Sequence, residues 1–249
     1  MSKNKQVILF IVEGITDQSA LEPIMKNILE EKDDKIKFRV LHKDITSHKD
    51  SKTNNIKKKL GEEINKYLDT YKLKRKDIRE VVHLIDTDGA FVPDTNIEEK
   101  NEGEIEYTED KIKVKNISNL KERNKRKTEI VKLLYKTDQI CRIIPYKIYY
   151  FSRNREHVLN NKDGTITEEE KNVIADEFSE EYENNIEEFY KFMCCSSGDV
   201  GDEYEASWKF IMKGTNSLKK YHNFHIYLQL LRTRYGDLSK IENVLFDDK

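Results

Sequence analysis

The sequence predicts an α/β protein in which helices flank a parallel sheet of four strands. Residues 7–12 (VILFIV) form an unbroken apolar run, which is typical of a strand covered on both faces. Apolar positions at helical spacing follow this run, and the alternation of strand and helix recurs along the chain. With only 9 glycines and 3 prolines among 249 residues, the chain lacks the many turns of an all-β protein.

The first strand and helix occupy the N-terminal part of the chain. The strand is residues 7–12, and Thr16 or Asp17 stands where a helix cap is expected. The apolar face of the helix is made of Leu21, Ile24, Met25, Ile28 and Leu29. Strand, short turn and helix therefore follow in that order.

Two further strands are expected at residues 38–41 and at residues 81–85 (VVHLI). The helix predicted between them carries on one side Ile56, Leu60, Ile64, Leu68 and Tyr71. Strands that alternate with helices are joined by right-handed crossovers and pair in parallel. Their carboxyl ends, where functional groups gather, should therefore meet at one edge of the sheet.

The polar stretch 92–127 is too long for an ordinary loop and is predicted to be an insertion that is mobile in part. Beyond it, Ile130, Val131 and Leu134 indicate a helix. Residues 143–151 (IIPYKIYYF) indicate a fourth strand, in which Pro145 confines pairing to the residues that follow it. We expect one domain over residues 1–152 and a mainly helical C-terminal region over residues 153–249.

The composition bounds the class of protein. Charged residues make up 37% of the chain and the net charge is −2, so any contact with phosphates must come from local basic patches. No apolar run approaches the roughly 18 to 20 residues that span a bilayer, which predicts a cytoplasmic protein without a membrane partner. The three cysteines have no C-x-x-C spacing, which favours reduced, mostly buried thiols over disulfides or a zinc ribbon.

Four carboxylates are predicted to meet at the carboxyl edge of the sheet. Glu13 lies one residue beyond the first strand, and Asp17 lies at the start of the next helix. Asp86 and Asp88 directly follow the third strand. Mg²⁺ and Mn²⁺ prefer carboxylate oxygens, and a bound ion would relieve the repulsion between these acids. The pattern therefore favours a site at which one or two metal ions act on a phosphate.

These segments resemble the Toprim motif of topoisomerases, bacterial primases, recombination-repair proteins and the OLD family of nucleases. In that motif a glutamate followed by glycine is joined later by D-x-D, which matches Glu13-Gly14 and the pair Asp86 and Asp88 here. The acid at Asp17 is similar to a second acid of the OLD-like branch, where glutamate is more usual. The resemblance covers residues 1–152, interrupted by the insertion. It implies a Toprim-like domain in which Glu13, Asp86 and Asp88 are catalytic.

Two further site elements are implied by resemblance alone. Residues 151–159 (FSRNREHVL) are similar to a serine, asparagine and glutamate element of small RloB-like Toprim proteins found beside defence loci. This implies that Glu156 approaches the metal and that Ser152 or Asn154 orients a phosphate, although this chain has only Arg155 where those proteins often have proline and an aromatic residue. OLD-like nucleases use a late lysine near the metals, which implies a catalytic role for Lys213; a surface lysine is the alternative.

Other signals are weaker. The basic run 121–127 (KERNKRK) is suited to a phosphate backbone, and a solvated helix start explains it equally. The position of His83 within the third strand favours a core residue over a ligand, and His222 and His225 lack the partners of a zinc site. The chain has no G-x-x-x-x-G-K-[ST] loop, so hydrolysis of ATP by that route is not expected.

The sequence favours a Mg²⁺- or Mn²⁺-dependent nuclease that acts on DNA or RNA. The resemblance also implies a phage-defence effector controlled by an ATPase encoded nearby. Residues 168–190, rich in acidic and aromatic side chains, are either a docking surface for such a partner or part of a helical core. A non-catalytic Toprim module that binds nucleic acid or a partner and a housekeeping RNA-maturation ribonuclease stay open as alternatives, as does homo-oligomerisation.

Overall fold

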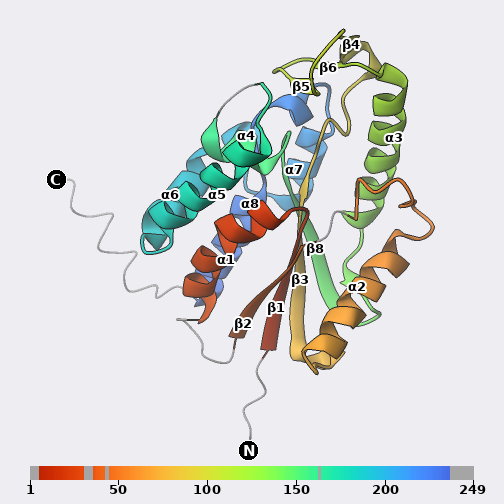
Figure 1. The fold of residues 1–249 in the computed structure, drawn as a ribbon. Coiled ribbons are helices and arrows are strands. Elements are labelled where there is room, and N and C mark those ends of the chain that lie inside the picture. Colours follow the sequence, from red (N-terminus) through yellow and green to blue (C-terminus); the bar gives the residue numbers. More distant parts are fainter. Residues whose placement is uncertain (1–5, 31–35, 43–44, 162–163, 236–249) are drawn as a thin grey trace, which may run out of the picture.

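The computed structural model describes residues 6–30, 36–42, 45–161 and 164–235, which have an α/β fold (Figure 1). A five-stranded sheet of order β2-β1-β3-β8-β7 lies at the centre. Its strands are β1 (Gln6–Val12), β2 (Ile36–His42), β3 (Ile78–Asp86), β7 (Gln139–Ile140) and β8 (Ile144–Phe151). The α/β class is confirmed. The sheet is mixed, however, because β7 pairs antiparallel with β8 while the other neighbours pair in parallel.

The position of Pro145 explains how β7 is accommodated. Parallel pairing between β3 and β8 begins at Tyr146, one residue after the proline. Pro145 itself pairs with Gln139 at the antiparallel edge of the sheet. Because proline has no N–H to donate, it is tolerated at such an edge and not in the interior of a sheet.

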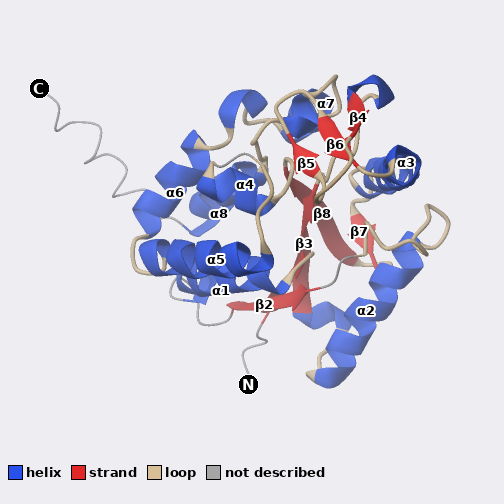
Figure 2. Ribbon diagram, turned by 45° about the horizontal axis from the view of Figure 1, so that its top comes forward, coloured by secondary structure: helices blue, strands red, loops and turns tan. Residues whose placement is uncertain are grey.

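Helices cover both faces of the main sheet (Figure 2). They are α1 (Ile15–Glu30), α2 (Ile56–Thr70), α3 (Ile117–Leu134), α4 (Arg155–Asn160), α5 (Glu168–Tyr182), α6 (Ile186–Cys195), α7 (Tyr204–Ile211) and α8 (Phe224–Tyr235). Side chains of β1 alternate between two separate cores. Ile8, Phe10 and Val12 pack with α1, α5, α6 and α8, whereas the residues between them pack with α2, α3 and α7.

The segment expected to be an insertion has secondary structure and a core of its own. It forms a small sheet of order β4-β6-β5, with β4 at Ile97–Glu99, β5 at Glu106–Tyr107 and β6 at Ile112–Val114. The rest of the segment is the first half of α3, which starts after Asn116. The side chain of Asn116 caps this helix by accepting a hydrogen bond from the backbone N–H of Asn119 at 2.9 Å.

The C-terminal region is helical as far as residue 235, and residues 236–249 lie outside the described residues. Phe178, Tyr182, Phe189 and Tyr190 are buried against α1 and α8. The helical-core interpretation of these aromatic side chains is therefore confirmed, and they supply no exposed anchors for a partner. None of the helices in the described ranges has the length and apolar character needed to traverse a bilayer.

The three cysteines are free thiols, but the expectation that they are mostly buried is wrong. Cys194 and Cys195 are exposed at the end of α6, and Cys141 is half-buried. The inward face of α6 is formed by Phe189, Tyr190 and Met193. The cysteines follow on the outer face of the same helix.

Candidate metal and phosphate site

The main sheet brings five acidic residues to one edge. Glu13 lies directly beyond β1, and the adjacent parallel strand β3 ends at Asp86, with Asp88 two residues later. Asp17 lies in the first turn of α1, and Glu156 lies in the first turn of α4. The charges of the other four acids all act on Asp86. The structure therefore brings together every carboxylate that the sequence analysis selected.

A buried lysine joins two of these carboxylates. The Nζ atom of Lys127, on α3, lies 2.6 Å from Asp88 Oδ2 and 3.3 Å from Glu13 Oε2. It also donates to Ser47 Oγ at 2.8 Å, and its side chain is only 1% exposed. Burial would lower the pKa of Lys127, but Asp88 and Glu13 together raise it above its ordinary value. Lys127 is therefore a buried cation at neutral pH.

A buried arginine holds a second pair of carboxylates. Arg155 Nε lies 3.1 Å from Asp17 Oδ1, and Arg155 Nη2 lies 3.0 Å from Glu156 Oε1. Asp17 also accepts a hydrogen bond from the backbone N–H of Gly14 at 2.7 Å, which caps α1 as the sequence predicts. Burial raises the pKa of Asp17, although Arg155 opposes the shift. Asp17 and Glu156 thus have a cationic partner within the protein.

Asp86 lies between these two ion pairs. Its Oδ1 atom accepts a hydrogen bond from the backbone N–H of Arg155 at 3.0 Å, and it forms no ion pair with any described residue. Burial, and then the charges of Asp17 and Glu13, raise the pKa of Asp86 well above its ordinary value. The centre of the cluster therefore carries an excess of negative charge that a further cation would neutralise.

A tight turn positions Asp88. Asp88 (φ 49°) and Gly89 (φ 84°) both have left-handed backbone conformations, and Ala90 N–H donates to Thr87 O at 2.7 Å. A Cβ atom at Gly89 would overlap Ile112 Cδ1 of the small sheet. The small sheet therefore packs directly against the turn that presents Asp88.

Two cations of α3 set the charge of Asp88. Arg123 Nη2 donates to the backbone carbonyl of Asp88 at 2.5 Å, and Lys127 pairs with its carboxylate. Burial alone would raise the pKa of Asp88, but Lys127 and Arg123 outweigh burial and lower it. Asp88 is consequently ionised at neutral pH.

The donor set fits a hard divalent cation. Glu13, Asp86 and Asp88 offer carboxylate oxygens, the ligands that Mg²⁺ and Mn²⁺ prefer, around a centre with excess negative charge. In the ranges that the structure describes, no three acidic, histidine or cysteine side chains are arranged to hold a metal ion as they stand. The position of Lys127 gives the reason, because its ammonium group occupies oxygens of both Glu13 and Asp88. Coordination through the same oxygens requires this ammonium group to shift.

Three residues that the resemblance selected have other surroundings. Ser152 is buried and its hydroxyl donates to Asn216 O at 3.4 Å, while the side chain of Asn154 caps α4. Lys213 is exposed after α7 and forms no ion pair within the described part of the chain. The lysine at the carboxylates is Lys127 instead, so a different element supplies the cation.

The sequence analysis missed the roles of both central cations. A signal for Lys127 was present, because it lies on the buried face of α3 with Leu120, Val131 and Leu134. A lysine on an apolar face requires a buried anionic partner, and Glu13 and Asp88 were the available acids. Arg155 gave no comparable signal, since it lies in a helix of only six residues without a clear periodicity.

The histidines belong to the core, as expected. His83 Nδ1 lies 2.7 Å from Tyr146 Oη, and His222 Nε2 lies 3.0 Å from Ser196 Oγ. Burial, supported by the charge of Lys127, lowers the pKa of His83 to about 3. Burial likewise lowers the pKa of His222 to about 3. Both rings are therefore neutral under ordinary conditions.

Comparison with known proteins adds no family to this description. No protein-family model, no curated protein and no solved structure matches the chain. The functional argument therefore depends on the geometry of the site and on the motifs in the sequence.

Proposed function

We propose that the chain is a Toprim-like nuclease that uses Mg²⁺ or Mn²⁺ to hydrolyse phosphodiester bonds of DNA or RNA. The observation that carries this proposal is the convergence of Glu13, Asp86 and Asp88 around a buried centre with excess negative charge. The topology supports it, because Glu13 and the D-x-D pair follow adjacent parallel strands at the edge where α/β proteins bind ligands.

Each charged group has a distinct role in this proposal. Glu13, Asp86 and Asp88 hold the metal, which when bound polarises a phosphate and lowers the pKa of water. Lys127 keeps Glu13 and Asp88 close to each other and supplies a fixed positive charge beside the reacting phosphate. Arg155 orients the carboxylates of Asp17 and Glu156.

A nuclease assay tests the proposal. The purified protein is expected to cleave DNA or RNA with Mg²⁺ or Mn²⁺ and to lose activity in a chelator. Asp86→Asn and Glu13→Gln should each lower the rate by about 100-fold or more, the usual effect of removing a charged group from a reacting centre. Asp176→Asn, at an exposed position of α5, is the matched control and should keep the wild-type rate. Undiminished cleavage by the double variant Glu13→Gln, Asp86→Asn would refute the proposal.

One observation favours a second candidate, a non-catalytic Toprim-like module that binds nucleic acid or a partner. Lys127 and Arg155 together pair four of the five carboxylates, which stabilises the cluster without any metal. Titration calorimetry separates the candidates. Uptake of Mn²⁺ by the wild type and its loss in Asp86→Asn support the nuclease, whereas no uptake at millimolar Mn²⁺ supports the module.

Control by a neighbouring ATPase in phage defence completes the proposal, as the resemblance implies. The absence of a phosphate loop from this sequence is consistent with ATP-dependent control by another chain. The exposed acidic side chains of α5 and α6 are the candidate contact surface, without the aromatic anchors first considered. Co-expression with neighbouring genes and affinity isolation test the idea. Equal nuclease activity with and without those neighbours would contradict it, and cleavage of a single structured RNA precursor would favour an RNA-maturation role.

A further inference from the structure

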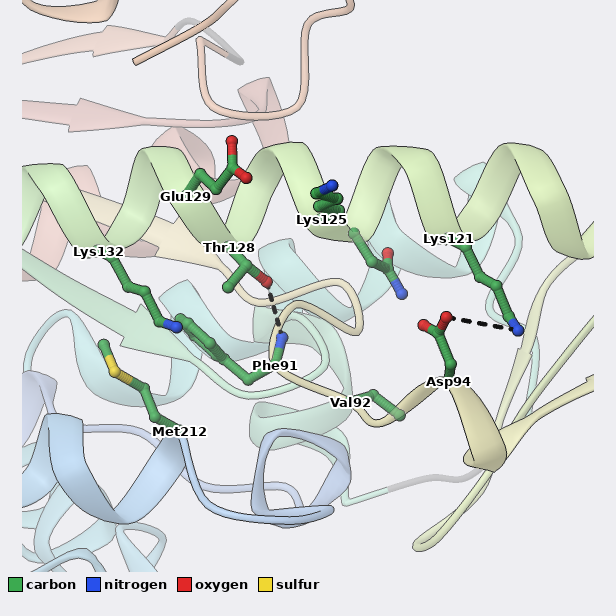
Figure 3. A pocket seen from close by; sticks show the side chains of 10 residues that line it. Phe91, Val92, Asp94, Lys121, Lys125, Thr128, Glu129, Lys132 and Met212 are labelled. Atoms are coloured by element: carbon green, nitrogen blue, oxygen red, sulfur yellow. Dashed lines mark hydrogen bonds and ion pairs between the residues drawn. The ribbon is translucent and has the colours of Figure 1, made fainter.

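A groove of about 370 Å³ runs along α3 next to the turn that carries Asp88 (Figure 3). Lys121, Lys125 and Lys132 line it from α3, and Phe91 and Met212 line it from the facing loop and from the end of α7. Lys121 pairs with Asp94 at 3.5 Å at one end of the groove. The lining thus combines lysine side chains with an aromatic ring.

The groove is continuous with the candidate metal site. Phe91 is three residues beyond Asp88, so their Cα atoms are at most about 11 Å apart. The same helix serves both places, because Lys127 points to the carboxylates while Lys125 and Lys132 line the groove. A chain molecule bound along the groove can therefore reach the carboxylates without leaving α3.

Two of the lysines are available for a ligand. Lys125 and Lys132 are exposed, and neither forms an ion pair with a described residue. Figure 3 shows Lys132 pointing toward Phe91 and Met212, whereas Glu129 points away from them. The acid between the two lysines in sequence therefore does not neutralise the groove.

The charge of the whole molecule is divided in the same sense. Helix α3 carries six basic and two acidic side chains, whereas residues 168–191, over α5 and α6, carry ten acidic and two basic ones. These elements lie on opposite sides of the main sheet (Figure 2). A polyanion is therefore attracted to the α3 side and repelled from the α5 and α6 side.

The backbone of Phe91 presents its ring at a strained position. Its φ angle is 74°, a conformation that bulky residues rarely adopt. The N–H of Phe91 donates to Thr128 Oγ1 at 3.0 Å, which fixes the loop against α3. The side chain is half-buried and borders the groove, so part of the ring is open to a flat partner. Such strain commonly marks a functional position.

We propose that this groove binds a single-stranded segment of nucleic acid and delivers its backbone to the carboxylates. Lys125 and Lys132 contact phosphates, and the Phe91 ring stacks on an unpaired base. A duplex keeps its bases stacked internally and offers no face to Phe91, so the groove selects a single strand. This inference rests on the proposed function for its chemistry, but strand binding is measurable without cleavage.

The test is fluorescence anisotropy of end-labelled oligonucleotides in EDTA, with single-stranded DNA, single-stranded RNA and duplex DNA of one sequence. Lys125→Gln, Lys132→Gln should weaken binding of both single strands by about 10-fold at moderate salt and make the dependence on salt shallower by one to two released ions, or about 0.7 in slope for each phosphate contact. The matched control Lys66→Gln, Lys191→Gln changes the charge equally at exposed positions outside the groove. It should bind with the wild-type affinity.

The aromatic role has its own variants. Phe91→Ala should weaken binding of single strands by about 10-fold, within the usual range for loss of one stacked base, and should leave weak duplex binding unchanged. Phe91→Tyr retains an aromatic face and should restore the affinity, and equal melting temperatures of the two variants exclude unfolding. Wild-type affinity in both the lysine double variant and Phe91→Ala, or no binding of single strands by the wild type, would overturn the inference. Binding with no cleavage in Mg²⁺ or Mn²⁺ would instead count only against the nuclease proposal, and the two strand chemistries distinguish DNA from RNA.

Discussion

Lys127 neutralises two carboxylates in a place that water does not reach, and its removal leaves both of them unpaired. Lys127→Met preserves the length and burial of the side chain but should lower the free energy of unfolding by about 3 kcal/mol, the usual effect of breaking a buried ion pair from one side. Millimolar Mn²⁺ should restore part of this loss, because an ion bound at Glu13 and Asp88 supplies the missing positive charge. Urea unfolding with and without Mn²⁺ measures both effects.

Lys125→Met is the control for this prediction, since Lys125 is an exposed residue of the same helix. Its free energy of unfolding should stay within about 0.5 kcal/mol of the wild type. If Lys127→Met unfolds at the same urea concentration as Lys125→Met, the ion pairs described for Lys127 contribute nothing to stability.

Gly89 is required by both backbone and packing. Gly89→Ala places a Cβ atom at a φ of 84° and against Ile112 Cδ1, and should lower the free energy of unfolding by about 1 to 3 kcal/mol. Gly201→Ala is a matched control, because φ is 76° there but no atom lies within 4 Å of the added Cβ. Thermal unfolding should show the larger loss for Gly89→Ala, and equal losses would mean that Ile112 moves aside at no cost.

Helix α3 connects the small sheet, the candidate metal site and the groove, so the cap that begins it matters to all three. Asn116→Ala removes the hydrogen bond from Asn119 N–H and should lower the free energy of unfolding by about 1 kcal/mol. Asn116→Asp keeps an acceptor at the same place and should retain most of the stability. Urea unfolding compares the two variants, and similar losses for both would show that the side-chain cap is not what stabilises this end of α3.

The strands and helices with a strong apolar period were predictable from sequence, and the others were not. β1, β3 and α2 lie where the periodicity of VILFIV, VVHLI and the Ile56–Thr70 segment indicates, because one or both faces of each are buried. β7 has two residues and the three strands of the small sheet have two or three, which is too short for any period to emerge. Their positions depend on pairing with distant segments, as Pro145 with Gln139 shows.

The acidic members of the site were predictable for a related reason. Parallel strands deliver their carboxyl ends to one edge, so Glu13 and Asp86 had to be near each other if the strands were adjacent. The basic members depend on how α3 and α4 pack onto that edge, which no local pattern encodes. Lys127 and Arg155 therefore became evident only from the contacts in the folded chain.

The stability of the entire molecule should fall in acid, partly because of two buried histidines. Burial lowers the pKa of His83 and of His222 to about 3, whereas an unfolded histidine has a pKa of about 6.5. The unfolded chain therefore binds more protons between these values. The stabilising effect is complete above about pH 6.5 and is lost as the pH falls toward 3, by up to about 1.4 kcal/mol per pH unit for each histidine.

Urea unfolding at a series of pH values tests this expectation. His222→Gln keeps a polar group near Ser196 but cannot take up the proton, so its stability should decline less steeply below about pH 6.5. His48→Gln alters an exposed histidine and should follow the wild-type curve. A wild-type slope in His222→Gln would mean that other groups account for the acid sensitivity.

The separation of positive α3 from negative α5 and α6 also gives the molecule a large electric dipole, although its net charge is only −2. In the field of any highly charged polymer, a dipolar particle experiences a torque before it makes contact. The protein would therefore rotate during its approach, and most first collisions would occur through the α3 side. Added salt shortens the reach of this torque to within roughly 10 Å at 0.1 M, so productive encounters should become rarer even where the final complex keeps every contact.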